Sequence, residues 1–291
     1  MLQNAVRNAA AVCALALTSV AAAQDQTWVV PQAAVTTAGS GGYSTLLRSQ
    51  PRSYQVVIGP EELGGIPAGS QITGITWRRP SWQVFATWPG QGFAAVFPNY
   101  DITLSTSVNP PGALSTTATQ NIGPDAVLVR SGPLTIADAF FPGGALTPQI
   151  NPFGTVIPFA APYTYAGGTL LITVRHQGHN IGANGSLDTV GSVYTQALGV
   201  DSYTQETNWY PQGLIVTRLS FTTPSEPPCP GDFNSDGQVT TGDITAFLSA
   251  WFADLANGTT EADADGSGAT TTGDISFFLG QWFQGVGAPG C

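Results

Sequence analysis

Residues 232–252 read DFNSDGQVTTGDITAFLSAWF and residues 263–283 read DADGSGATTTGDISFFLGQWF, so the end of the chain repeats itself at an offset of 31 residues. Eleven of the 21 aligned pairs are identical. In each copy, a stretch rich in oxygen-bearing side chains and glycine precedes apolar residues at helical spacing. The repeat therefore predicts two loop-helix units that bury their apolar faces against each other.

The oxygen-bearing side chains of each loop have the spacing that a hard cation such as Ca²⁺ requires. They occupy loop positions 1, 3 and 5, while glycine permits a sharp turn at position 6 and aspartate closes the shell at position 12. Position 7 supplies a backbone carbonyl, and position 9 is a threonine. We expect one calcium ion in each loop, two in all. The predicted ligands are Asp232, Asn234, Asp236, Gln238, Thr240 and Asp243 in the first loop, and Asp263, Asp265, Ser267, Ala269, Thr271 and Asp274 in the second.

An apolar stripe follows each loop at the spacing i, i+3, i+4, i+7 and i+8, and we expect the two stripes to be buried together. Prolines 227, 228 and 230 exclude a helix before the first loop, so each unit is a loop with one following helix (an F-hand) and lacks the entering helix of an EF-hand. The stripes are Ile244, Phe247, Leu248, Trp251 and Phe252, then Ile275, Phe278, Leu279, Trp282 and Phe283.

These residues resemble a type I dockerin, a module whose paired loop-helix repeats bind two calcium ions and, in cellulosomes, dock an enzyme onto a cohesin. The resemblance covers residues 229–291 only. Cys229, Cys291 and the preceding Gly290 are more similar to the GC-type dockerin ends of bacterial secreted proteins. The resemblance implies a calcium-dependent docking module whose partner is a cohesin-like or other cell-surface protein.

The two loops differ at positions that bear on calcium affinity. The second loop has Ser267 at position 5, and it has Thr270 at position 8, where the first loop has the apolar Val239. We therefore expect the second site to be weaker than the first, or to need the first site to be filled.

The positions that carry much of the cohesin contact in cellulosomal dockerins are small or apolar in this chain. Leucines replace the usual polar or basic residues at position 17, and they can either anchor a partner or pack between the helices. Cohesin binding therefore does not follow from the calcium loops. The positions are Thr241, Gly242, Leu248 and Ser249, then Thr272, Gly273, Leu279 and Gly280.

The first 23 residues have the features of an export signal. Arg7 precedes an uncharged apolar stretch, residues 9–23, that ends in small residues. A membrane anchor is the alternative, but it needs about 20 apolar residues and this stretch is shorter. We expect cleavage after Ala23, no transmembrane segment in the mature chain, and a secreted, extracellular or cell-surface location.

Cleavage would leave Cys229 and Cys291 as the two remaining cysteines, and an even pair in an exported chain favours one disulfide. This bond would tie together the two ends of the last domain. Two separate thiols, or a bond between chains, remain alternatives, because the sequence does not give the distance between the Cα atoms.

Residues 24–223 read as strands separated by turns, without a helical apolar period of ten residues or more. A stretch of this length predicts one β-sandwich with jelly-roll-like connections. Prolines then mark a linker, residues 224–230, before the module at 231–291. The fold class is thus mainly β, followed by a small α-helical calcium-binding module. The clearest strand candidates are residues 54–58, 72–77, 101–105, 126–130, 169–175 and 214–221.

Charged residues are scarce and unevenly placed. The chain has 18 acidic and 8 basic residues, and eight of the acidic ones lie in residues 229–291, which contain no lysine or arginine. Residues 24–228 hold ten acidic residues and seven arginines, a net charge of about −3. Nucleic acid is therefore excluded as a partner, because no basic surface is present to bind phosphate. The negative charge of the module favours a cation.

Residues 24–223 offer three weaker candidate sites. Trp77, Arg79 and Trp82 could form a platform for stacking on sugars, although tryptophan in a sandwich core is more often buried packing. His176 and His179 could ligate a metal, but the intervening Gly178 indicates a turn, and we predict solvated loop histidines. Two carboxylates could form a glycosidase pair, yet no spacing selects a pair among Asp101, Asp125, Asp138, Asp188, Asp201 and Glu206.

We therefore favour a non-catalytic secreted or cell-surface protein, in which a β-sandwich for adhesion or for binding glycans or other ligands is docked through its calcium module. A carbohydrate-active enzyme that hydrolyses polysaccharide is the second hypothesis, because dockerins often accompany such enzymes. A structural component of the envelope is the third. The scarcity of charged residues argues against catalysis, and so does the lack of a spacing that selects one pair of carboxylates.

Overall fold

The computed structural model describes residues 25–83, 87–144, 150–223, 229 and 231–286. The chain divides into two compact units, Met1–Pro224 and Ser225–Cys291. The predicted signal peptide lies outside the described residues, and so does the predicted linker apart from Cys229. Cys291 lies outside them too, so its disulfide with Cys229 stays a prediction. Among the described helices, none is long and apolar enough to cross a membrane.

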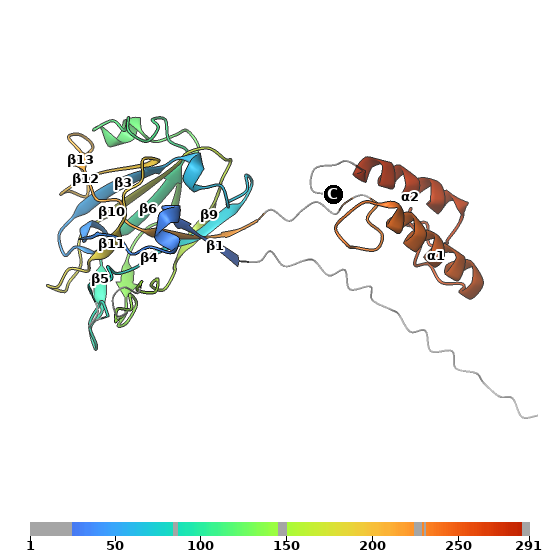
Figure 1. Ribbon diagram of the computed structural model, residues 1–291, viewed down its shortest axis with the longest axis horizontal. Coiled ribbons are helices and arrows are strands. Elements are labelled where there is room, and N and C mark those ends of the chain that lie inside the picture. The colour runs from blue at the N-terminus through green and yellow to red at the C-terminus, as the bar shows by residue number, and fades with distance from the viewer. Residues whose placement is uncertain (1–24, 84–86, 145–149, 224–228, 230, 287–291) are drawn as a thin grey trace, which may run out of the picture. The chain divides into compact units, whose positions relative to one another are not determined.

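The first unit contains two main antiparallel sheets (Figure 1). The smaller sheet has the order β1 (Asp25–Val30), β14 (Thr217–Thr222), β4 (Gln71–Trp77), β9 (Ile157–Thr164). The larger has the order β13 (Tyr210–Pro211), β12 (Thr195–Val200), β3 (Arg52–Ile58), β10 (Leu170–His176), β6 (Tyr100–Ser105), β7 (Val127–Arg130). Two short pairs are β11 (Leu187–Thr189) with β2 (Gly41–Tyr43), and β5 (Ala95–Phe97) with β8 (Leu134–Ile136). The prediction of a mainly β chain is confirmed.

One hydrophobic core contains side chains from both main sheets. Ile75 and Leu219 of the smaller sheet and Val56 and Ile172 of the larger belong to the same buried cluster. Side chains alternate along a strand, so the neighbouring Val57 points to the opposite face, where a second cluster includes Trp209. The larger sheet is therefore covered on both faces at its centre, which explains why every residue of β3 is buried.

A buried ion pair ties the N-terminal part of this unit to its core. The guanidinium of Arg78 lies 2.8 Å from the carboxylate of Asp188, and both side chains are 1% exposed. Arg78 also donates to the carbonyls of Ala34 and Thr37, at 2.7 and 2.9 Å, while Asp188 accepts from the N–H of Gly39 at 3.1 Å. Each charged group faces the opposite charge and forms hydrogen bonds, so the pair can be buried without leaving an unpaired charge in the core.

His176 and His179 are buried, so the prediction of solvated loop histidines is wrong. His176 lies on β10, where its ring stacks on Tyr100 at 5.4 Å between centroids. His179 is in edge contact with Trp88 and Phe97, at 5.4 and 5.0 Å. The two rings are fillers of the aromatic core rather than surface groups, because distant segments of the chain cover the turn that follows β10.

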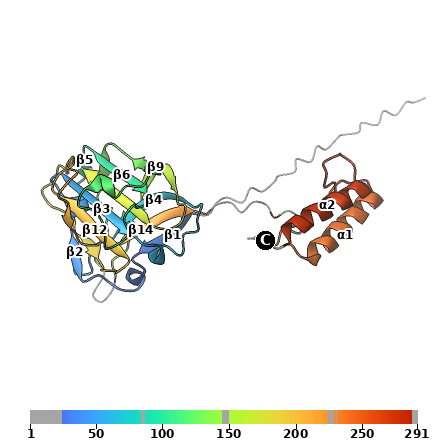
Figure 2. The same cartoon turned by 90° about the horizontal axis from the view of Figure 1, so that it is seen from above.

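The second unit consists of two loops and two helices. The helix α1 (Thr241–Asn257) and the helix α2 (Thr272–Gly285) lie side by side in both views (Figures 1 and 2). The rings of Phe247 and Phe278 stack between the helices with centroids 4.2 Å apart, and Phe233 from the first loop meets both rings edge-on. The unit is thus closed around three aromatic rings.

The structure settles two positions of each predicted stripe. Phe252 and Phe283 are 63% and 70% exposed, so the prediction that the whole stripe is buried is wrong at position i+8. Leu248 and Leu279, which the sequence left open as partner anchors or core residues, pack against the buried cluster of the module. Two helices alone cover only the middle of each other's stripe, and the described residues of this unit supply no third layer for its edge.

Candidate metal centre

In the first loop, the side-chain oxygens turn inward onto the backbone of the loop itself. Asp232 accepts hydrogen bonds from the N–H groups of Asp236 at 3.1 Å and Gly237 at 2.9 Å. Asn234 accepts from the N–H of Asp236 at 3.0 Å, and Asp236 accepts from that of Gln238 at 2.9 Å. The carboxylates at positions 1, 5 and 12 of this loop do not gather within 4.8 Å of one another, as three carboxylates of the second loop do. The side chains at positions 1, 3 and 5 are nevertheless held against the loop backbone.

The second loop repeats this arrangement. Asp263 accepts from the N–H groups of Ser267 at 3.0 Å and Gly268 at 2.7 Å, and Asp265 accepts from that of Ser267 at 3.0 Å. The hydroxyl of Ser267, at position 5, donates to the carbonyl of Ala269 at 3.2 Å. The replacement of aspartate by serine at this position thus changes the ligand chemistry without changing the path of the loop.

The aspartate at position 12 closes each loop. Asp243 accepts from the N–H groups of Thr240 at 2.8 Å and Asn234 at 3.2 Å, and Asp274 accepts from the equivalent N–H groups at 2.7 and 3.1 Å. Both aspartates are buried, and each forms a capping box with the first turn of its helix. One oxygen of Asp274 also accepts the hydroxyl of Thr271 at 3.2 Å, so the capping threonine helps to hold this carboxylate.

Hydrogen bonding keeps the two position-12 carboxylates ionised. Burial by itself would raise the pKa of Asp243, but N–H donors led by Thr240 and Asn234 outweigh burial and hold this pKa below its usual value. For Asp274, the N–H groups of Thr271 and Asp265 are the main cause of a lowered pKa. Both groups are therefore in the charged form that binds a metal.

Three carboxylates of the second loop lie close enough to share one ion. Oxygens of Asp263, Asp265 and Asp274 all lie within 4.8 Å of one another. Ligands at 2.3–2.6 Å from a Ca²⁺ ion are at most about 5 Å apart, so this spacing fits a calcium shell. Like charges at such distances repel, and the module has no basic residue to offset them. A bound cation would remove this repulsion.

The backbone of both loops enters the left-handed region at two positions. Gly237 and Gly268, at position 6, have φ of 83° and 89°, as the sequence led us to expect. Position 4 also has a positive φ, 58° at Ser235 and 71° at Gly266. The sequence reasoning missed position 4, although the glycine in the second repeat was a signal for it.

The threonines at position 9 have a structural role in addition to the predicted one. The hydroxyls of Thr240 and Thr271 cap their helices by accepting an N–H two residues later, each at 3.1 Å. Their carbonyls accept the indole N–H of a tryptophan from the opposite repeat, Trp282 to Thr240 and Trp251 to Thr271, both at 2.7 Å. These two cross-ties join each loop to the other helix. The repetition of tryptophan at the 31-residue offset was their only signal in the sequence.

The predicted sugar platform does not form a shared exposed surface. Trp77 is 1% exposed and belongs to the core, and Arg79 is buried as well. Trp82 alone of the three is exposed, at 53%. Trp77 thus follows the alternative of buried packing, because the strand β4 directs it between the two sheets, and a platform of all three residues is ruled out.

The candidate catalytic carboxylates of the first unit are engaged with other partners. Tyr203 donates to Asp101 at 2.6 Å, and Tyr163 donates to Asp125 at 2.6 Å. Asp188 pairs with Arg78, Asp201 with Arg52, and Glu206 with Arg175. Among the described residues, the one cluster of three or more His, Cys, Asp or Glu side chains with the spacing of metal ligands lies in the second loop, so none of these six carboxylates belongs to one. Thus, for five of the six carboxylates, the neighbours are partners that hold the fold.

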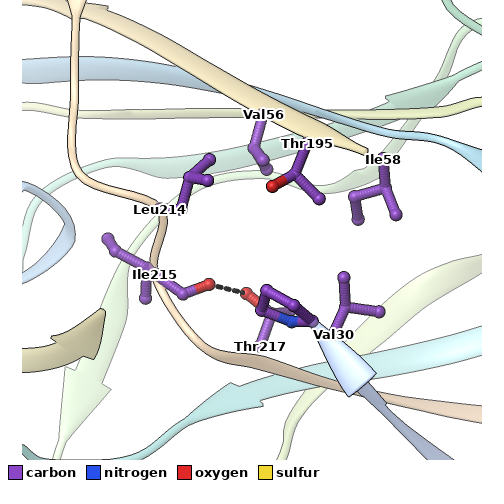
Figure 3. A pocket seen from close by; sticks show the side chains of 8 residues that line it. Val30, Val56, Ile58, Thr195, Leu214, Ile215 and Thr217 are labelled. Atoms are coloured by element: carbon purple, nitrogen blue, oxygen red, sulfur yellow. Dashed lines mark hydrogen bonds between the residues drawn. The ribbon is translucent and has the colours of Figure 1, made fainter. Parts of the chain in front are cut away.

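Two cavities of the first unit are poor enzyme sites. The first has a volume of about 10 Å³ (Figure 3), which holds at most one water molecule; its lining includes Val56, Ile58 and Thr217. In it the hydroxyl of Thr217 donates to the carbonyl of Ile215 at 3.0 Å (Figure 3). The second is an open surface hollow of about 380 Å³ beside Arg130, whose guanidinium already donates to the carbonyl of Gly132 at 3.0 Å. Neither cavity combines an enclosed volume with several reactive side chains that point into it.

Comparison of the chain with protein families, with curated proteins and with solved structures finds no match.

Proposed function

We propose that residues 229–291 are a calcium-dependent docking module of the dockerin kind, with two F-hand repeats that each bind one Ca²⁺ ion. The observation that carries this proposal is the equivalence of the two loops. The side chains at positions 1, 3 and 12 accept the same backbone N–H groups in both, and three carboxylate residues of the second loop have oxygens within 4.8 Å of one another. Divalent calcium supplies the positive charge that the module lacks.

A docking role is supported by the surface that the two helices expose next to their loops. Thr241, Gly242 and Ser249 are exposed on the first repeat, and so are their counterparts Thr272, Gly273 and Gly280 on the second. These residues are small and uncharged, so a partner backbone can approach closely and bury the surface without desolvating an ion. The partner would be a cohesin-like or other cell-surface protein.

For the first unit, we propose a β-sandwich with jelly-roll-like connections that serves adhesion or binds glycans or other ligands outside the cell, without catalysis. The shared core of the two sheets supports the sandwich. The engaged carboxylates and the form of the two cavities favour a binding or structural role over hydrolysis. An export signal in residues 1–23 and a disulfide between Cys229 and Cys291 belong to the same proposal.

Calcium titration of the purified protein, followed by circular dichroism, tests the metal site. We expect the helical signal to rise on addition of Ca²⁺ and to fall in chelator, because an empty loop leaves its carboxylates repelling one another. Mg²⁺ should give a much smaller rise, since it demands a tighter octahedral shell. The matched control is the double change Asp232→Ala and Asp263→Ala, which should abolish the response. An identical helical signal in calcium and in chelator would remove the module from the metal-dependent class.

Pull-down from envelope extracts tests the docking role separately. We expect a partner to be retained with calcium and lost in chelator, with little dependence on salt, because no charged pair crosses the proposed surface. The double change Thr241→Arg and Thr272→Arg should abolish retention while leaving calcium binding intact. Undiminished capture by this variant would leave the module as a calcium-stabilised end of the chain without a docking role.

A further inference from the structure

A buried carboxylate outside the calcium loops connects the two repeats. Asp254, in the last turn of α1, is 2% exposed. It accepts hydrogen bonds from the hydroxyl of Thr259 at 2.5 Å, the N–H of Ala262 at 2.6 Å and the hydroxyl of Thr270 at 2.8 Å. Burial alone would raise its pKa, but these donors outweigh burial and lower the pKa of Asp254 to about 2. The carboxylate is thus ionised and held by groups that precede the second loop and by one within it.

The donors to Asp254 bracket the start and the middle of the second loop. Ala262 immediately precedes the first ligand position, Asp263, and Thr270 occupies position 8, between the predicted ligands Ala269 and Thr271. Ala262 is fully buried in the cluster between the helices. The residue before the second loop and the residue at its position 8 are therefore both hydrogen-bonded to one side chain of the preceding helix.

The first loop has no equivalent of this contact. The residue 31 positions after Asp254 is Gly285, which has no side chain, and the counterpart of Thr270 is the buried Val239. Entry to the first loop is fixed instead by close packing, since a Cβ atom on Gly231 would come within 2.3 Å of the backbone of Trp282. The repeat symmetry is thus broken at the entry to each loop and at position 8, although the tryptophan contacts at position 9 obey it.

We propose that Asp254 is a positioning residue for the second calcium site, which fastens that loop to α1 and so sets the calcium affinity of the second loop but not of the first. The inference rests on the proposed calcium binding. It explains why the second loop keeps its shape although position 5 is a serine, whose hydroxyl is a neutral ligand in place of a carboxylate. A loop that is already ordered loses less entropy on binding, and this raises its affinity.

Nuclear magnetic resonance of the whole protein can follow each loop separately. The N–H groups of Gly237 and Gly268 donate to Asp232 and Asp263, at 2.9 and 2.7 Å, so their resonances report the filling of the first and second loop. In Asp254→Asn, we expect the calcium concentration for half of the Gly268 shift to rise about tenfold, since hydrogen bonds to a charged group are lost. The midpoint for Gly237 should change less than about twofold.

Thr270→Val provides a milder variant that is compatible with the fold, because the first loop has valine at the same position. It removes one donor to Asp254 and should shift the Gly268 midpoint in the same direction by a smaller factor. Thr245→Ala is the matched control on α1, since its hydroxyl is exposed and donates to the carbonyl of Thr241, at 3.1 Å. This change should leave both midpoints unaltered.

The outcomes separate this inference from the proposed function. If the wild-type glycines respond to calcium but Asp254→Asn and Thr270→Val leave the Gly268 midpoint unchanged, or move both midpoints equally, Asp254 is not a positioning residue of the second site. If neither glycine responds to calcium in the wild-type protein, the proposed metal binding fails, and the inference fails with it.

Discussion

The two units of the chain obtain their stability in different ways. In the β unit, large aromatic side chains such as Trp77, Tyr100 and Phe141 fill a core that both main sheets share. In the module, the corresponding cluster has three buried members, Phe247, Ala262 and Phe278. A domain of some 60 residues gains only a few kcal/mol from so small a core, and a metal ion or a disulfide commonly supplements it. We expect the β unit to fold without a ligand and the module to depend on calcium.

The units also differ in how they neutralise buried charge. In the β unit, the carboxylate of Asp188 has its counter-charge in Arg78. In the module, the buried carboxylates Asp243, Asp254 and Asp274 accept only neutral donors, because residues 229–291 contain no lysine or arginine. The β unit thus carries a counter-charge for its buried carboxylate, whereas in the proposed calcium-bound state the module would take its positive charge from solution.

The largest effect is expected from removing a ring of the module core. Phe247 is fully buried and stacks on Phe278, so Phe247→Ala should cost about 3–5 kcal/mol, which is comparable with the whole stability of so small a domain. Helical circular dichroism should be lost even at saturating calcium. The matched control is Phe252→Ala on the same helix, an exposed ring whose loss should change stability by less than about 0.5 kcal/mol. Equal losses from the two changes would mean that Phe252 is buried in solution.

The sequence was most informative where it repeated itself. The mainly β chain with two C-terminal helices was predictable, because turn residues separate the strands and the apolar period marks the helices. The exposure of Phe252 and Phe283 was not, because periodicity shows that a residue lies at the edge of a stripe but not how wide a surface the partner helix covers.

Contacts between distant segments account for the other differences. Gly178 correctly indicates a turn, with a φ of 88°, but the carbonyls that meet His176 and His179 belong to Thr45 and Leu47, more than 130 residues earlier. Likewise, Thr270 differs from the apolar Val239 of the first loop because its hydroxyl donates to Asp254, a contact that the sequence does not show. Local composition predicts loops and ligands, whereas side-chain partners far away in the chain depend on the tertiary fold.

Breaking the internal ion pair should destabilise the β unit alone. Arg78→Ala leaves Asp188 as a buried charge without its counter-charge, which typically costs about 3–5 kcal/mol. Thermal unfolding should show the β transition lowered, while the calcium response of the module stays the same. Glu206→Gln is the control, because Glu206 is 43% exposed and its pair with Arg175 contributes about 1 kcal/mol or less. A parallel loss of calcium response in Arg78→Ala would mean that the two units do not fold independently.

Mild acid should destabilise the β unit but not the module, and this is the smallest of the expected effects. Burial is the main cause that lowers the pKa of His176 from 6.5 to about 4. The N–H of Gly178 donates to Nδ1 at 3.0 Å, so the ring proton lies on Nε2 and donates to the carbonyl of Thr45 at 2.8 Å. A second proton on Nδ1 would break the bond from Gly178 and place a charge in the aromatic core.

Because the folded pKa of His176 lies below the unfolded value, its contribution is fully present above pH 6.5 and is lost as pH falls towards 4, up to roughly 3 kcal/mol. Chemical denaturation at a series of pH values should show this loss in the β unit. In the module, which has no histidine, the helical signal in calcium should stay constant over the upper part of this range, because the lowered pKa values of Asp243 and Asp274 keep these carboxylates ionised. His176→Phe should reduce the pH dependence of the β unit, whatever its effect on absolute stability, and His179, whose pKa burial also lowers, accounts for part of what remains. An unchanged slope in this variant would assign the acid sensitivity to other groups.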